Sequence, residues 1–145
     1  MIKMATVETI CFQDEIPVIL TTCLELETYI KGHHVYKEVW TPELGEQLNV
    51  RMEPDNRVDK FAVCVEKDQA VVGHLKKGNS VKFAKTIFYF LRSDTYSSCY
   101  VTVSGKRCNL KDGEWLQVPC KMIIMGQKKY ANILKRELQK INELR

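Results

Sequence analysis

A chain of 145 residues with a formal net charge of +4 fits one globular domain. Its composition, 45% hydrophobic and 28% charged, is ordinary for a folded protein, and no apolar run approaches the roughly 20 residues of a membrane-spanning helix. The charge is uneven: residues 1–70 carry 7 Lys/Arg and 13 Asp/Glu, whereas residues 71–145 carry 15 and 5, which favours either a polyanion-binding face or two halves that attract each other.

The first half of the chain is rich in β-strand patterns. Residues 1–20 lack a basic stretch followed by an apolar one, so the protein is expected to be nuclear or cytosolic and not secreted. Alternation is cleanest where Leu48, Val50 and Met52 point one way and the polar residues between them the other. The predicted strands are 17–30, 33–40, 47–53, 61–67 and 70–75, the last two joined by a tight turn at Asp68 and Gln69.

Helical spacing enters in the second half. Residues 78–92 place apolar side chains on one helical face behind Ser80, a suitable N-cap. Strands are predicted at 96–105 and 114–126, and Pro119 in the second indicates a sheet edge or a bulge. The last predicted element is a basic helix with an apolar stripe formed by Tyr130, Ile133, Leu134, Leu138 and Ile141.

These elements predict an α+β fold, a small antiparallel β-barrel with an inserted helix and a C-terminal helix. No repeat, low-complexity tract or linker interrupts the sequence. We therefore expect a single domain, 1–145, in which residues 18–126 form the barrel and residues 127–145 an amphipathic basic helix.

Signals for enzyme chemistry are weak. The six cysteines lack zinc-site spacing and mostly lie in apolar runs, so they are expected to be reduced and structural. His33 and His34 are adjacent and would face opposite sides of a strand. Asp55 and Asp59 are a candidate carboxylate pair, but carboxylates in turns more often cap backbone amides. The sequence predicts neither an enzyme nor a metal or cofactor site.

The polar turn at 54–60 is the strongest binding signal. It crowds together Asp55, Asn56, Arg57 and Asp59, and it precedes a hairpin whose far end is the loop 73–79. Because a hairpin brings its two outer ends together, the turn is expected to lie near the histidine and lysines of that loop. Such a pocket suits a ligand with both phosphate and hydroxyl groups. The alternative is a surface ion pair between Asp59 and Lys77, worth about 0–1 kcal/mol.

The segments VRMEPDNRVDKFAVCV (50–65) and AVVGHLKKG (70–78) resemble the core of a HIRAN domain. That family has an acidic-Pro-x-Asn-x-aromatic-Asp-basic-x-Ala run, followed by a Val/Ile-Gly-His/Tyr-apolar strand and basic residues. A weaker likeness extends from Gly32 to residues 116–126. The matching residues are Glu53, Pro54, Asn56, Asp59, Lys60, Ala62, Val63, Val65, Val72, Gly73, His74, Leu75, Lys76 and Lys77.

The resemblance implies a barrel related to OB and SH3-like folds that captures the free 3′ end of single-stranded DNA. By this resemblance Asp59 would accept a hydrogen bond from the terminal 3′-hydroxyl, and Asn56 and Asp55 would fix the sugar–phosphate. Basic residues of the following loop would contact phosphate. The nucleic-acid-binding residues predicted are Asp55, Asn56, Arg57, Val58, Asp59, His74, Lys76, Lys77, His34, Val35, Tyr36 and Leu116.

Two aromatic positions of the family pattern are valines here. Val58 stands before the motif aspartate, preceded by Arg57 instead of proline, and Val35 stands on the early strand. Each stacked base contributes about 1–3 kcal/mol to single-strand binding, and valine has no π-face. The aromatic or imidazole side chains that could substitute are His34, Tyr36, Trp40 and Trp115.

Two functions follow from the sequence. The first is a monomeric binding module for single-stranded DNA, or another nucleic acid, with a preference for a free 3′-hydroxyl end. The second is a protein-interaction domain on the same barrel that has lost end binding and uses its basic C-terminal helix.

Overall fold

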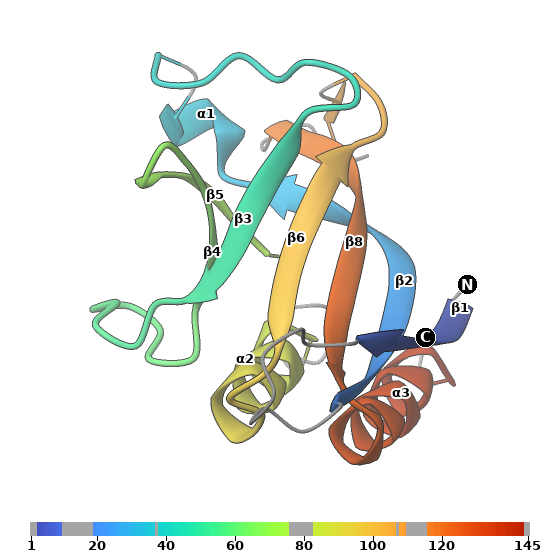
Figure 1. Cartoon of the computed structure of the whole chain (residues 1–145). Coiled ribbons are helices and arrows are strands. Elements are labelled where there is room, and N and C mark those ends of the chain that lie inside the picture. Colours follow the sequence, from blue (N-terminus) through green and yellow to red (C-terminus); the bar gives the residue numbers. More distant parts are fainter. Residues whose placement is uncertain are drawn as a thin grey trace.

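A single antiparallel sheet closes into a six-stranded barrel, with helices packed outside it (Figure 1). The computed structural model describes residues 3–9, 19–36, 38–75, 83–106, 108–109 and 116–143. The strands follow the order β1-β2-β5-β4-β3-β6-β8-β7, and β2 also pairs with β8, which closes the barrel and confirms the predicted α+β class. The strands are β1 (Lys3–Thr9), β2 (Ile19–Lys31), β3 (Gln47–Met52), β4 (Val63–Lys67), β5 (Ala70–Leu75), β6 (Ser98–Val103), β7 (Cys108–Asn109) and β8 (Leu116–Gln127); the helices are α1 (His33–Tyr36), α2 (Phe83–Ser93) and α3 (Lys128–Glu143).

Strand β2 closes the barrel because its 13 residues reach three neighbours. It pairs with β1 near its start, with β8 from Thr21 to Lys31, and with β5 through Ile30 and Lys31 alone. Leu24 and Ile30 lie in the interior and are fully buried, as expected for the alternating half of a strand. The short β2–β5 ladder brings the end of β5 next to the residues that follow β2.

Helices α2 and α3 pack against each other at one end of the barrel (Figure 1). Their buried residues recur at helical spacing, for example Ile87 and Phe88 in α2 and Leu134 and Leu138 in α3. Ile133, predicted as part of the apolar stripe of α3, is instead about half exposed. No helix in the described parts of the chain has the length and apolar character that crossing a bilayer requires.

The strand predicted at residues 33–40 is wrong. The chain leaves β2 at Gly32, where φ is +88°, and forms the short helix α1 followed by a turn. A residue with positive φ ends an extended strand, and glycine adopts that conformation without steric cost. Trp40, which completed the apparent alternation, is buried in the core instead of continuing a strand.

Pro119 lies where β8 has a ladder partner on one side only, so the expected edge is present locally but the bulge is not. The pairing of β8 with β2 runs through Pro119 opposite Tyr29 without a register shift. On its other side the β6 ladder ends at Cys120 and the β7 ladder begins at Gln117. Proline is tolerated between the two ladders because neither needs a backbone donor there. Strands β1 and β7 were not predicted.

Candidate nucleic-acid interface

Asn56 organises the loop between β3 and β4, called here the β3–β4 loop. Its Oδ1 accepts hydrogen bonds from the backbone N–H groups of Val58 and Asp59, each at 2.9 Å. Its Nδ2 donates to Oε1 of Glu53 at 2.5 Å. The loop is closed by the Glu53 N–H, which donates to the Ala62 carbonyl at 2.9 Å. Asparagine suits this position because one side chain supplies both the acceptor and the donor.

The other polar residues of the loop divide into two kinds. Asp59 helps to shape the loop, because its Oδ1 accepts a hydrogen bond from the Phe61 N–H at 2.9 Å. It therefore has, in part, the amide-capping role that was the alternative to a binding role. Asp55, Arg57 and Val58 are exposed, and Val58 is 91% exposed. The loop thus combines an internal hydrogen-bonded frame with an exposed rim.

Glu53 joins the loop to strand β5. Its Oε1 lies 3.0 Å from Nε2 of His74 and also accepts the Asn56 amide. Burial raises the pKa of Glu53, but the hydrogen bonds from Asn56 and His74 outweigh it, so the net pKa is lowered. Because Glu53 is ionised at neutral pH and only accepts, Nε2 of His74 must carry the proton between them. The polar turn and the end of β5 are therefore in direct contact.

A hollow of about 140 Å³ lies where the loop, β5 and α2 meet. It brings together four of the predicted site residues, Asn56, Val58, Asp59 and His74. Lys76 and Lys77 lie outside the described residues, so their predicted phosphate contacts remain predictions. The hollow, called here the end hollow, is lined by Asn56, Val58, Asp59, Ala62, Val63, His74, Leu75 and Ala84.

Helix α1 adds an aromatic ring to this region. The ring centroids of Tyr36 and His74 are 6.3 Å apart, and the rings are tilted by 45°. Burial, followed by the nearby negative charge of Glu53, raises the pKa of Tyr36. Val35 is exposed, and the side chain of His34 is not among those described. Tyr36 is therefore the α1 residue that the structure places beside the predicted site.

Two other predicted candidates lie elsewhere. Trp40 is 2% exposed and its Nε1 donates to Oε1 of Glu46 at 2.9 Å, so its ring cannot stack on a base. Leu116 begins β8, and its side chain is not described; the next residue, Gln117, pairs with Lys31 of β2. The start of β8 is thus separated from His74 by one strand. Trp115 lies outside the described residues.

A cluster of aromatic and basic side chains beside the end hollow was missed by the sequence reasoning. The Phe61 ring lies 5.5 Å from the Phe88 ring and 5.4 Å from the Tyr89 ring, measured between centroids. Lys85 and Arg92 lie over these rings. The spacing of Lys85, Tyr89 and Arg92, at i, i+4 and i+7, was the available signal, because it places them on one helical face. Their contact with Phe61 depends on the tertiary fold.

The thiol nearest His74 and the metal-holding groups can be assessed for the described residues. Cys64 pairs with His74 across the β4–β5 ladder, but the thiol is buried and burial raises its pKa to about 11. It is therefore a protonated thiol and a weak nucleophile at neutral pH. The described residues contain no group of three His, Cys, Asp or Glu side chains that could hold a metal ion. The described free cysteines are Cys23, Cys64, Cys99 and Cys120.

Comparison with known proteins identifies the fold. No protein-family model and no curated protein matches the chain. The structure is similar to the crystal structure of the HIRAN domain of human HLTF, with a TM-score of 0.61 and 20% sequence identity over 81% of this chain and 88% of that one. The NMR structure of the HLTF HIRAN domain gives a TM-score of 0.55 at 16% identity, over 79% and 87% of the two chains. The predicted resemblance to HIRAN domains is therefore confirmed at the level of the fold.

Proposed function

We propose that this chain is a single-stranded nucleic-acid-binding module that recognises a free 3′-hydroxyl end. The end hollow carries the proposal, because it joins the carboxylate of Asp59, the amide of Asn56 and the imidazole of His74 in a space of about 140 Å³. The HIRAN-like fold supports it. The proposal assigns no catalytic activity to the chain, and a monomer in the nucleus or cytosol is part of it.

The chemistry of the hollow favours a hydroxyl over a phosphate. Asp59 is an acceptor when ionised, and a terminal 3′-hydroxyl is a donor. A 3′-phosphate would bring further negative charge next to Asp59, and close to Glu53, which contacts the lining residues Asn56 and His74, and like charges at short distance repel. Phosphates further along the strand would contact the basic residues Lys76 and Lys77. End preference should therefore depend on Asp59 more than on total positive charge.

The test compares oligonucleotides that differ only at the 3′ end. Fluorescence anisotropy with 3′-hydroxyl and 3′-phosphate strands should show tighter binding of the hydroxyl end by the wild-type protein. Asp59→Asn keeps an oxygen that can accept the Phe61 N–H but removes the charge, so it should reduce the ratio of the two affinities. Asp68→Asn, the same change at the exposed β4–β5 turn, is the matched control and should leave the ratio unchanged. Equal wild-type affinities for the two ends would refute end recognition.

A second candidate function, a protein-interaction domain, is favoured by a groove between α2 and α3. The groove has a volume of about 280 Å³, and Tyr89 and Ile133 in its lining are 38% and 49% exposed. A protein partner retained on the purified chain at moderate salt after nuclease treatment, with no oligonucleotide affinity, would favour this function. The groove residues are Thr86, Tyr89, Phe90, Ser93, Tyr130, Ile133, Leu134 and Glu137.

A further inference from the structure

Phe61, Phe88 and Tyr89 form a cluster of three rings on the outside of the barrel, called here the aromatic patch. Phe88 is buried and meets Phe61 edge to face at an interplanar angle of 86°. Phe61 is half-buried, Tyr89 is 38% exposed, and their rings are tilted by 37° with centroids 5.4 Å apart. Phe88 thus anchors two rings that are open to solvent in part.

Three exposed cations surround these rings. Nζ of Lys85 lies 4.6 Å from the centroid of Phe61 and 5.9 Å from that of Tyr89. Nζ of Lys60 lies 5.2 Å from the Phe61 centroid, and Cζ of Arg92 lies 4.5 Å from that of Tyr89. Cation–π contacts at exposed sites are weak, so long flexible side chains can leave the rings when a stronger partner arrives.

The aromatic patch is continuous with the end hollow. Phe61 follows Asp59 by two residues, and its N–H is held by the Asp59 carboxylate. On the opposite side Ala84 lines the hollow, and the next residue is Lys85. A strand whose terminal nucleotide occupies the hollow therefore has the aromatic patch within reach of its next bases.

We propose that the aromatic patch is a base-stacking platform for the nucleotides that precede the 3′-terminal one. It would supply the π-faces that the loop lacks, since Val58 on the rim has none. Single-strand binding surfaces combine aromatic rings with cations that follow the backbone, and both are present here. On binding, Lys85 and Arg92 would move from the ring faces to phosphates. This inference rests on the proposed single-strand binding.

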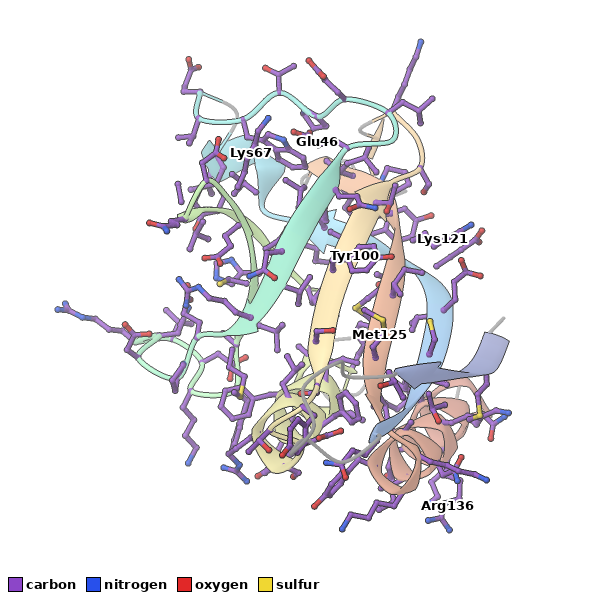
Figure 2. The ribbon with its side chains drawn as sticks, in the orientation of Figure 1. Glu46, Lys67, Tyr100, Lys121, Met125 and Arg136 are labelled. Carbon is purple, nitrogen blue, oxygen red and sulfur yellow. The ribbon has the colours of Figure 1, made fainter. Side chains whose placement is uncertain are left out.

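The aromatic test replaces the two open rings with a smaller side chain that is still apolar. Phe61→Leu and Tyr89→Leu keep an apolar side chain but have no π-face, so each should weaken binding of an oligonucleotide of about ten nucleotides by about 5-fold or more. Tyr100→Leu is the matched control, because Tyr100 lies midway along β6, away from α2 (Figure 2). The ratio of 3′-hydroxyl to 3′-phosphate affinity should stay as in the wild type. Equal melting temperatures of the variants and the wild type would show that folding is intact.

The cationic test uses the dependence of affinity on salt. Lys85→Gln and Arg92→Gln should each lower the slope of log K against log salt by about 0.7, the value for one single-strand phosphate contact. Lys121→Gln, on β8 away from α2 (Figure 2), should leave the slope unchanged. Wild-type affinity for oligonucleotides in both leucine variants would overturn the stacking platform while leaving end recognition intact. If the leucine variants lose affinity but the wild type does not distinguish the two ends, end recognition fails and the platform stands. A wild-type protein that binds no oligonucleotide refutes both.

Discussion

Asn56→Ala should unfold the β3–β4 loop locally and weaken the whole domain. The substitution removes two acceptor contacts to backbone N–H groups and one donor contact to the ionised Glu53. A neutral hydrogen bond contributes about 1 kcal/mol and one to a charged group about 1.5–3 kcal/mol. Water can replace some of these hydrogen bonds in a half-exposed loop, so we expect the free energy of unfolding to fall by about 2 kcal/mol. For a chain of this size the loss corresponds to a fall in Tm of about 4–8 °C.

Urea denaturation followed by circular dichroism measures the loss. The midpoint should fall while the m-value stays constant, because the amount of surface exposed on unfolding is unchanged. The matched control is Asn49→Ala, since Asn49 is exposed and its side chain makes one hydrogen bond, at 2.9 Å to Glu66. It should cost less than Asn56→Ala, because only one hydrogen bond is lost and water can replace it at this exposed position. Oligonucleotide binding by Asn56→Ala should fall as well, because the loop forms one wall of the end hollow.

Asn56→Asp separates the acceptor half of the side chain from the donor half. The aspartate can still accept from Val58 and Asp59, but it places a second carboxylate 2.5 Å from Glu53 in place of the amide donor. At neutral pH it should therefore be at least as destabilised as the alanine variant. If Asn56→Ala costs no more than Asn49→Ala, the description of Asn56 as the organiser of the loop is refuted.

Three further predictions concern residues that stabilise the fold. The pKa of Glu53 is lowered in the folded protein, so its carboxylate stabilises the fold above about pH 4.3, and that stability is lost as the pH falls through the folded pKa. In a plot of urea midpoint against pH, Glu53→Gln should therefore show a smaller fall at acidic pH than the wild type. An equal fall in the variant and the wild type would contradict this. Asp94 is 1% exposed and accepts bonds from the N–H and side-chain amide of Gln127 at 2.7 and 2.9 Å, so Asp94→Ala should cost about 3 kcal/mol or more in urea denaturation. A Cβ at Gly73 would lie 2.8 Å from the Lys31 carbonyl oxygen, so Gly73→Ala should destabilise the fold by about 1–3 kcal/mol, and hydrogen exchange should show early opening between β2 and β5.

Local patterns predicted most of the barrel because burial on one face imposes alternation. Strand β3 was predicted almost to the residue, since Leu48 and Val50 are buried and their neighbours Gln47, Asn49 and Arg51 are exposed. The alternating pattern gave a wrong prediction at residues 33–40. Gly32 ends the strand there, and Trp40 is buried in the core without being part of a strand. Strand β1 was missed because pairing with β2 is a long-range interaction that leaves little trace in a short segment.

Part of the candidate site could also be predicted from the sequence. A hairpin must bring its outer ends together, and this placed the polar turn next to His74 from sequence alone. The internal roles of Asn56 and Glu53 were not foreseen, because which oxygen accepts which donor depends on side-chain directions in the folded loop. The aromatic patch depends on the packing of α2 against the loop, and no local period encodes the contact between Phe61 and Tyr89.

The arrangement of charge predicts the polarity with which a strand lies on the surface. Asp59 lines the hollow and Glu53 contacts two of its lining residues, Asn56 and His74, whereas the adjoining face of α2 presents Lys85 and Arg92. A hydroxyl terminus fits the acidic end, and interior phosphates are attracted to the basic side, so the 3′ end should occupy the loop and the 5′ direction should extend over α2. A hydrogen bond to an ionised carboxylate contributes about 1.5–3 kcal/mol, which sets the preference for a 3′-hydroxyl at about 10- to 150-fold.

Blocking groups test this polarity. A bulky group on the 3′ oxygen should weaken binding by most of the expected preference of about 10- to 150-fold for a 3′-hydroxyl. The same group on the 5′ oxygen of a strand of about ten nucleotides should have little effect, because the stacked bases and the phosphate contacts lie between that group and the hollow. Anisotropy titrations with the two blocked strands, in the wild type and in Asp59→Asn, measure both effects. The variant should lose the difference between the strands. A larger penalty for the 5′ block than for the 3′ block would mean that the strand runs the other way and that the hollow does not hold its 3′ end.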